Sequence, residues 1–408
     1  MPASIVEKPV ATGIAGLDTI LRGGLFPGGL YILEGTPGSG KTTLANQVAY
    51  NRARAGDRVV YVTLLAEGHD RMLRYMAGFD FFDPRFIPDR LSYISAFDAL
   101  RREGLGGVLA MLRDTIRQCG ARLLLLDGLY VAQERAASKG DFREFIYEMQ
   151  GEAALHGCTV VFITGGLQPE HGAERTMVDG IIQLGQESRG ARSVRTLAVL
   201  KFRGARNLKG IHHFRIGDAG IVVTPRLETL FEKPPETIPD RRLTSGIPSL
   251  DTMTRGGIPV GSSTLVVGPS GVGKTTAREP GVFFGAYETP DKVKAKAAGV
   301  GIDIAAKLDS KALSIVWQKP FDTFPDEMAA NLLAHVERTG AKRVFIDGIG
   351  AFRKVAFQPD GLEAFFAALA LRLRQLGATT FYTVEAKEFF VTDSLVLDEI
   401  SVIAENTV

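Results

Sequence analysis

Short apolar runs alternate with longer mixed stretches through the first half of the chain. The runs YILEG, RVVYVTLL, ARLLLLDG and CTVVFITGG have the length of strands, and stretches of helical composition such as TTLANQVAYNRARAG separate them. Continuous apolar strands separated by helices are typical of a parallel sheet covered on both faces. A later pair of runs, RTLAVLKFRG and HHFRIGDAGIVVTP, predicts an antiparallel addition at the edge of that sheet. The pattern therefore predicts an α/β fold with a mostly parallel β-sheet flanked by helices.

The beginning of this pattern occurs twice. TGIAGLDTILRGGLFPGG at 12–29 is echoed by SGIPSLDTMTRGGIPVGS at 245–262, and the same offset continues without a gap into GTPGSGKTT and GPSGVGKTT, pairing Lys41 with Lys274. Two tandem copies of one domain follow from this repeat. Residues 224–242 are rich in proline and charge and lack a sustained apolar period, as a linker should. We therefore expect a first domain at 1–225, a linker at 226–243 and a second, shortened domain at 244–408.

Composition limits the classes of function. A chain of 408 residues is long enough for two domains with substantial cores. Its net charge of +2 hides no block of like charge, so the balance implies neither a nucleic-acid nor a membrane partner. Cys119 and Cys158 lack metal-ligand spacing and are interpreted as reduced, buried thiols. The N-terminus has no signal-peptide core and the longest apolar runs fall short of about 18 residues, so a soluble cytoplasmic protein is expected.

The segment GTPGSGKT at 35–42 directly follows an apolar strand and opens a helix, the context that a phosphate-binding P-loop requires. Glycines let the backbone turn so that successive N–H groups face phosphate oxygens at the positive end of the helix. Lys41 would reach the β and γ phosphates, and the Thr42 hydroxyl suits Mg²⁺. Chance would give this pattern in a few per cent of chains, at roughly 10⁻⁴ per position, but not twice in register. The predicted ATP-binding residues are Gly35, Thr36, Pro37, Gly38, Ser39, Gly40, Lys41, Thr42 and Thr43.

Each copy also has a carboxylate at the tip of an apolar strand. LLLLDG ends at Asp127 and VFIDG ends at Asp347. In open α/β sheets, ligands lie outside the carboxyl ends of the strands, so the P-loop and this aspartate converge there. We expect Asp127, directly or through a water, to share Mg²⁺ with Thr42.

The motifs GLD, GGLFPGG, GTPGSGKTT, LLLLDG and LKFRG together resemble the KaiC-like branch of the RecA-type P-loop ATPases, and the resemblance covers nearly the whole chain. It implies two tandem RecA-like P-loop NTPase domains. It also implies Mg²⁺ and ATP bound between neighbouring subunits of a ring, usually a hexamer. Hydrolysis in this family drives conformational signalling, so a protein signalling partner is expected.

The same resemblance assigns further residues. Family members orient the attacking water with paired glutamates after the second strand, a role that needs a carboxylate. Here the segment reads YVTLLAEGHD, so that Leu65 and Ala66 occupy the paired positions and Glu67 is the remaining candidate; the alternative is a carboxylate capping a helix that begins near His69. Lys201 and Arg203 of LKFRG correspond to a basic pair that touches the neighbour's γ-phosphate; the alternative is a solvated strand face.

The second copy has lost parts that a nucleotide site needs. Only TTAREPG follows Lys274 before the next apolar run, and Pro280 allows one or two helical turns at most. A parallel crossover generally needs a dozen or more residues, so either the strand order or the P-loop shape should differ from the first copy. The C-terminal ISVIAENTV offers no counterpart to the basic pair. We expect weak nucleotide binding or none there, with the candidates Gly268, Gly271, Gly273, Lys274, Thr275, Glu288 and Asp347.

Three alternatives to a ring ATPase stay open. A nucleotide-sensing scaffold with little hydrolysis would fit the altered glutamate pair. An autophosphorylating Ser/Thr kinase would depend on Ser401 and on the compromised second P-loop. A DNA-dependent recombinase or helicase would need a basic or aromatic loop, whereas GGLQPEHGAERTM has two glutamates, one arginine and no aromatic residue, which disfavours a nucleic-acid partner.

Overall fold

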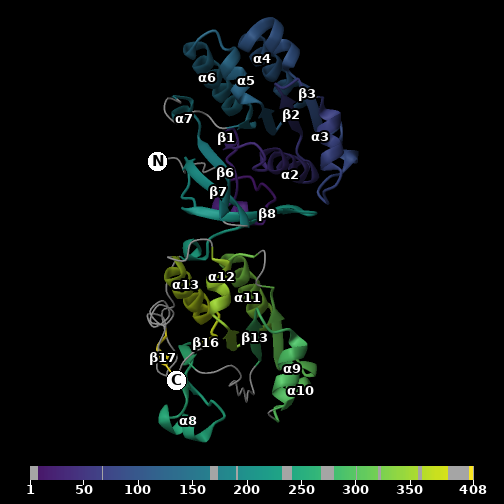
Figure 1. The fold of residues 1–408 in the computed structure, drawn as a ribbon. Helices are drawn as coiled ribbons and strands as arrows, with labels where there is room; N and C mark the ends of the chain where they lie inside the picture. The colour runs from purple at the N-terminus through teal and green to yellow at the C-terminus, as the bar shows by residue number, and fades with distance from the viewer. Residues whose placement is uncertain are drawn as a thin grey trace. The chain divides into compact units, whose positions relative to one another are not determined.

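The computed structural model divides the chain into two compact units, Met1–Arg226 and Leu227–Val408 (Figure 1). It describes residues 8–66, 68–165, 173–189, 192–231, 241–267, 280–299, 301–319, 323–356, 361–384 and 404–407. Each unit has an α/β architecture, which confirms the predicted fold class of tandem RecA-like domains.

The first unit is built on one nine-stranded sheet in the order β3-β2-β4-β5-β1-β6-β7-β8-β9. Its strands are β1 (Leu30–Gly35), β2 (Val59–Thr63), β3 (Leu91–Ser95), β4 (Leu123–Asp127), β5 (Thr159–Thr164), β6 (Gly180–Arg189), β7 (Arg192–Phe202), β8 (Ile211–Gly217) and β9 (Gly220–Thr224). Its helices are α1 (Ala15–Ile20), α2 (Lys41–Arg54), α3 (His69–Met76), α4 (Phe97–Cys119), α5 (Leu129–Arg135), α6 (Lys139–His156) and α7 (Ala173–Met177), with a 3-10 turn, η1 (Pro84–Phe86). Pairing is parallel from β3 through β6.

Helices cover both faces of the parallel part of this sheet (Figure 1). On one face, alternate residues such as Val62, Leu124 and Phe162 join a buried cluster with side chains of α4, α5 and α6. On the other face, α2 packs on β1, β2 and β4. Every residue of β1, β2 and β5 is buried, because strands covered on both faces have no polar side.

The last three strands form the antiparallel addition that the sequence predicted. β7, β8 and β9 pair antiparallel with their neighbours, starting from β6. This addition also touches the segment before α2, since a Cβ on Gly40 would lie 2.9 Å from the side chain of Ile216 on β8. The addition therefore supports the loop that precedes α2.

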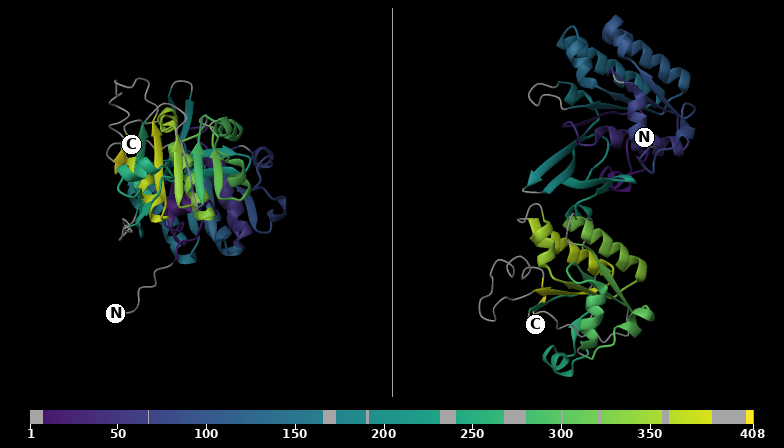
Figure 2. Two further views of the ribbon diagram at one scale, coloured as in Figure 1. Left: turned by 90° about the horizontal axis from the view of Figure 1, so that it is seen from below. Right: turned by 45° about the vertical axis from the view of Figure 1, so that its right-hand side comes forward.

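The second unit has a six-stranded sheet in the order β14-β13-β15-β16-β12-β17, all of it parallel. The strands lie side by side in Figure 2, left. They are β12 (Ser263–Val267), β13 (Gly281–Gly285), β14 (Leu313–Trp317), β15 (Arg343–Asp347), β16 (Thr379–Val384) and β17 (Asn406–Thr407), with a separate pair, β10 (Arg242–Leu243) and β11 (Ile258–Pro259). The helices are α8 (Pro248–Met253), α9 (Pro290–Gly299), α10 (Ala305–Asp309), α11 (Pro325–Thr339), α12 (Gly350–Val355) and α13 (Leu362–Gln375), with η2 (Leu227–Leu230) as a 3-10 turn.

The strand order of the second sheet is that of the first six strands of the first sheet. The short crossover predicted that either the strand order or the P-loop shape would differ from the first copy. The strand order does not differ, so that part of the prediction is wrong. The segment joining β12 to β13 contains the second P-loop at 268–275, which lies outside the described residues. The core of the second unit is formed by α11, α12 and α13 against β13, β15 and β16.

The repeated lead-in has the same backbone in both units. Asp18 accepts hydrogen bonds from the backbone N–H groups of Thr12 and Gly13, and Asp251 accepts one from the N–H of Ser245. A Cβ on Gly24 would lie 2.0 Å from a backbone carbonyl oxygen, and one on Gly257 would lie 2.1 Å from the equivalent oxygen. The aspartate of the GLD motif thus closes a turn, and the glycines allow a close backbone approach.

Part of the range expected as a linker belongs to the second core. The η2 turn packs on α11 and α13, and the buried Leu227 donates its N–H to Asp326 at 2.9 Å.

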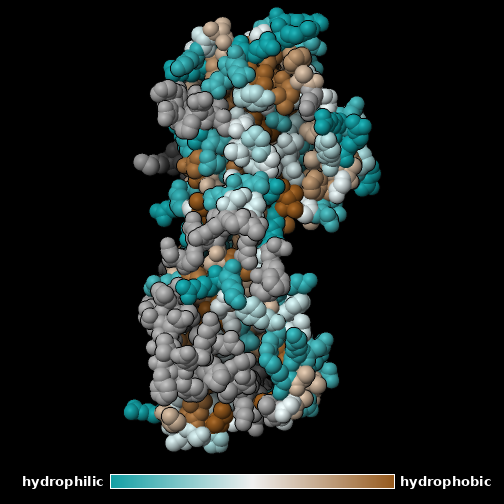
Figure 3. Space-filling model, viewed as in Figure 1, coloured by the Kyte–Doolittle hydropathy of each residue, from teal (hydrophilic) through white to brown (hydrophobic). Residues whose placement is uncertain are grey.

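On the face drawn in Figure 3 the outer helices carry mainly hydrophilic side chains. Among the described residues, no helix combines the length and apolar character needed to cross a membrane.

Candidate phosphate site

The P-loop lies between β1 and α2, as the motif predicted, and its glycines are required by geometry. A Cβ on Gly35 would lie 2.3 Å from the carbonyl oxygen of Leu184 on the neighbouring β6. Gly38 and Gly40 have φ angles of +79° and +103°, which residues other than glycine rarely adopt. The tight turn is thereby fixed by the two strands and the start of α2.

The loop has the features of an anion cradle. α2 begins at Lys41, and no side-chain hydrogen bond caps it at Gly40, so its first N–H groups and the positive end of the helix dipole face the loop. The Oγ of Ser39 is buried and has no hydrogen-bond partner among the described residues. Lys41 donates to the carbonyl oxygens of Gly35 at 2.6 Å and Thr36 at 2.9 Å. The N–H groups at the start of α2 and the Lys41 ammonium are donors that fit a polyphosphate.

Asp127 ends β4 at the carboxyl edge of the sheet, in register with Thr63 of β2. It accepts a hydrogen bond from the Tyr61 hydroxyl at 2.9 Å. Burial raises the pKa of Asp127, although the Tyr61 hydroxyl and the Lys41 ammonium act in the opposite direction. Burial likewise lowers the pKa of Lys41, against the attraction of Asp127. The structure thus brings the lysine and the aspartate within electrostatic reach of each other.

Thr42 and Thr43 lie in the first turn of α2 and are half-buried. The carbonyl oxygen of Thr42 accepts a hydrogen bond from the Asn46 amide at 2.8 Å, and the Tyr93 hydroxyl in turn donates to Asn46 at 2.8 Å. This second layer holds the start of the helix. A hydroxyl at Thr42 and a carboxylate at Asp127 are oxygen ligands of the kind Mg²⁺ prefers.

Two charged residues near the loop were missed by the sequence analysis. Arg195 of β7 donates to the carbonyl oxygen of Gly38 at 2.7 Å. Glu34, immediately before Gly35, is 3% exposed and pairs with Arg175 of α7. The position of Glu34 next to the motif was a usable signal, but its partner lies 141 residues away and local patterns do not reveal it.

Lys201 and Arg203 are close together at the end of β7. The Lys201 ammonium donates to the carbonyl oxygens of Arg175 and Thr176 at 2.9 and 2.7 Å, and Arg203 donates to that of Thr176 at 2.9 Å. Burial, and then the neighbouring Arg203, lower the pKa of Lys201. Both side chains therefore contact the end of α7 within their own unit.

Glu67 lies outside the described residues. The residues around it are described: α3 begins at His69, as expected, with Gly68 as its N-cap. The backbone N–H of Leu65 donates to the Thr63 hydroxyl at 3.1 Å. These contacts leave the proposed water-orienting role of Glu67 a prediction.

Of the candidate residues of the second unit, the structure describes only some. Gly268, Gly271, Gly273, Lys274 and Thr275 lie outside them, as does Ser401. Glu288 forms an ion pair with Lys296 of α9. Asp347 ends β15, in register with Gly285, and accepts a hydrogen bond from the Thr383 hydroxyl at 2.7 Å. Asp347 thus has the position in its sheet that Asp127 has in the first.

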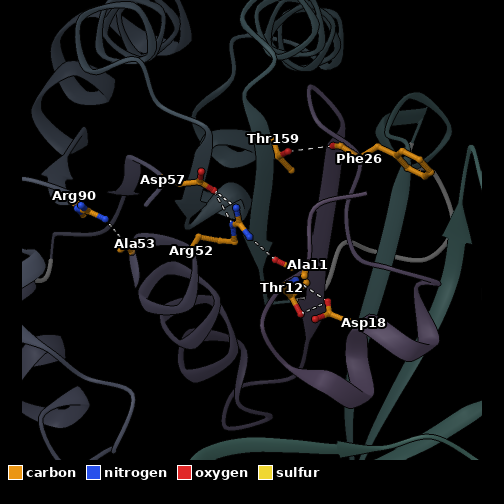
Figure 4. A network of polar contacts seen from close by, with 9 residues as sticks. All are labelled: Ala11, Thr12, Asp18, Phe26, Arg52, Ala53, Asp57, Arg90 and Thr159. Carbon is orange, nitrogen blue, oxygen red and sulfur yellow. Dashed lines mark hydrogen bonds and ion pairs between the residues drawn. The ribbon is translucent and has the colours of Figure 1, made fainter. Parts of the chain in front are cut away.

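A cavity of about 260 Å³ lies at the opposite, amino-terminal edge of the first sheet, lined by residues that include Leu123 and Thr159 at the starts of β4 and β5. Figure 4 shows its polar rim, where Arg52 pairs with Asp57 and donates to the carbonyl oxygen of Ala11. This cavity is separate from the P-loop, because parallel strands place their two ends on opposite edges.

Comparisons of the sequence with known proteins agree on one family. A family model described as "ATPase: KaiC" matches residues 10–228 and 243–396, which is most of the chain. The chain belongs to the KaiC ATPase family. KaiC-family members similar to it include the circadian clock oscillator protein KaiC of Prochlorococcus marinus (strain MIT 9313), 24% identical over 98% of this chain and 84% of the relative. KaiC 1 of Synechocystis sp. (strain ATCC 27184 / PCC 6803 / Kazusa) is 23% identical over 99% of this chain and 82% of the relative.

Proposed function

We propose that this KaiC-family protein hydrolyses ATP to ADP and phosphate, and that hydrolysis drives conformational signalling to a protein partner from a ring oligomer, with a hexamer as the expected ring. The observation that carries the proposal is the P-loop of the first unit. The start of α2 and the Lys41 ammonium fit phosphate, and Lys41 and Asp127 shift each other's pKa at the carboxyl edge of the same sheet. Family membership supports ATP as the nucleotide.

The proposed roles follow from the donor types. The backbone of Gly35–Thr42 and the Lys41 ammonium bind the phosphates, while Thr42 and Asp127 hold Mg²⁺. A magnesium ion held by Thr42 and Asp127 would supply positive charge that offsets the charge of the phosphates. Glu67 is the candidate for orienting the attacking water. Lys201 and Arg203 would meet the nucleotide of the adjacent subunit.

Size measurement with and without Mg·ATP tests the site and the assembly together. We expect the parent protein to form a larger species with Mg·ATP, and Lys41→Ala to stay small, because the variant lacks the ammonium that meets the β and γ phosphates. Calorimetry on the same two proteins should give a binding heat that Lys41→Ala abolishes. If both proteins titrate alike, the P-loop is not the nucleotide site.

A second candidate function, a nucleotide-sensing scaffold, is favoured by the replacement of the paired glutamates with Leu65 and Ala66. Turnover by Glu67→Gln separates the two functions. An ATPase that uses this carboxylate should lose about 10²-fold or more in kcat, since general-base assistance contributes 10²–10⁴-fold. A scaffold should show the same trace hydrolysis in both proteins, with nucleotide binding unchanged.

We further propose that the second unit binds nucleotide weakly or not at all. The stoichiometry of ATP binding by the full chain tests this without isolating a fragment. The parent and Lys274→Ala should each bind one nucleotide per chain, and Lys41→Ala should bind none at micromolar ATP. Two sites per parent chain, with one lost in each variant, would show that the second P-loop is competent.

A further inference from the structure

The carboxylate of Glu34 is buried beside the P-loop and is fully engaged. It is the residue of β1 before Gly35, whose carbonyl oxygen accepts from Lys41. One carboxylate oxygen pairs with the Arg175 guanidinium at 2.5 Å, and the other accepts from the Gln183 amide of β6 at 3.1 Å. A carboxylate that is 3% exposed is tolerated because the ion pair and the second hydrogen bond compensate its desolvation.

Arg175 belongs to α7, and the same short helix holds the basic pair. The carbonyl oxygens of Arg175 and Thr176 accept three side-chain hydrogen bonds from Lys201 and Arg203. Arg203 also donates its backbone N–H to the Asp179 carbonyl oxygen at 2.8 Å, and its guanidinium lies 3.8 Å from the Asp179 carboxylate. Below the helix, Asp179 accepts from the N–H of Leu30 at 3.0 Å and donates its own N–H to the Leu30 carbonyl oxygen at 2.7 Å. Both ends of β1 are therefore tied to the segment that carries α7.

We propose that the Glu34–Arg175 ion pair is a positioning contact that sets where Lys201 and Arg203 stand relative to the P-loop of their own subunit. No described contact joins the two basic side chains to the P-loop. They contact α7, whose Arg175 pairs with Glu34, and Glu34 is bonded to the first residue of the P-loop. The inference rests on the proposed function for its catalytic consequence. In a ring where the basic pair serves the adjacent site, this contact links one subunit's phosphate loop to the next subunit's nucleotide.

The contact should respond to loss of either partner. Removing one member of a buried pair leaves the other charge desolvated and unmatched, so the freed partner moves toward water. Arg175 is about one-quarter exposed and can do so, taking the carbonyl oxygens of α7 with it. Glu34→Gln keeps the shape of the side chain and its contact with Gln183 while removing the charge. Arg175→Met removes the partner from the less buried side, and Arg175→Lys keeps the charge.

Hydrogen exchange of the full-length protein without nucleotide tests the positioning role directly. We expect amides of a peptide covering 175–179 to exchange about tenfold faster in Glu34→Gln and Arg175→Met than in the parent, and at nearly the parent rate in Arg175→Lys. The matched control is Arg113→Gln, which removes an arginine paired with Glu152 between α4 and α6. It should leave this peptide unchanged. Parent-like exchange in both Glu34→Gln and Arg175→Met would overturn the proposal.

Steady-state kinetics then test the consequence. We expect kcat for ATP to fall about tenfold in Glu34→Gln and Arg175→Met, with KM changed by less than about twofold, because the phosphate cradle stays while the basic pair is misplaced. Arg175→Lys should recover most of kcat. An unchanged kcat in variants with accelerated exchange would remove the link to catalysis. If the parent neither binds nor hydrolyses ATP, the proposed function fails, but the exchange comparison still decides the positioning role.

Discussion

Replacing Asp127 by asparagine should separate the binding role of this carboxylate from its effect on stability. Asparagine keeps an oxygen that can accept from the Tyr61 hydroxyl, which now donates to Asp127 at 2.9 Å. It removes a charge that burial disfavours. It also removes the attraction to Lys41, yet burial is the largest cause of the pKa shifts of both residues. Relief of desolvation should therefore exceed the lost attraction.

The expected gain in unfolding free energy without nucleotide is about 1 kcal/mol, typical of substitutions that relieve a functional site. In a unit of this size it raises Tm by roughly 2–4 °C. Because burial raises the pKa of Asp127, the folded protein keeps this proton at pH values where the unfolded chain has released it. The stability that the protonated Asp127 carboxyl contributes is fully present below the ordinary pKa of 3.8 and is lost as pH rises through the raised pKa. The gain of the variant should thus grow as pH rises through the raised pKa of Asp127.

Scanning calorimetry of the full chain at pH 7, with and without Mg·ATP, is the assay. Asp127→Asn should melt higher than the parent without nucleotide and lose most of the stabilisation by Mg·ATP, since it lacks the carboxylate for the metal. The matched control is Asp57→Asn at the opposite edge of the sheet, where the carboxylate pairs with Arg52 and both side chains are largely buried (Figure 4). It should lower stability by about 1 kcal/mol and keep the Mg·ATP response. A fall in Tm for Asp127→Asn like that of the control would refute the reasoning.

The remaining predictions concern the fold of the first unit. Gly24→Ala should lose roughly 3 kcal/mol of unfolding free energy, because its Cβ would lie 2.0 Å from the carbonyl oxygen of Val10. Gly151→Ala, at an exposed position of α6 with no heavy atom within 4 Å of its Cβ, should gain about 0.5–1 kcal/mol, and urea unfolding of both variants checks the contrast. Burial raises the pKa of the Cys158 thiol to about 12, so in the native protein at pH 8 the half-buried Cys119 should alkylate first, as mass spectrometry of iodoacetamide-treated protein can show; equal labelling would contradict the buried position of Cys158.

Local patterns carried the prediction of the elements and of the motif. Continuous apolar runs indicated which segments become buried strands, because a strand covered on both faces is mostly apolar whatever its neighbours are. The repeated glycines were equally readable, since Gly24 and Gly257 meet the same backbone oxygen in both units. The motif at 35–42 could be placed between β1 and α2 because it is defined by that context. The expectation that both cysteines are buried was correct for Cys158, whereas Cys119 is half-buried.

Contacts between distant segments were decided only by the tertiary structure. Three contacts join residues far apart in the chain. They are the ion pair of Glu34 with Arg175, the hydrogen bond from Arg195 to the P-loop, and the hydrogen bonds from the basic pair to α7. The short second crossover predicted a change in either the strand order or the P-loop shape, but the second sheet has the same strand order as the first. Periodicity is a property of each segment by itself, so the sequence determines what a strand or helix buries. Which strand becomes its neighbour, and which charge meets which, depends on the packing of the whole sheet.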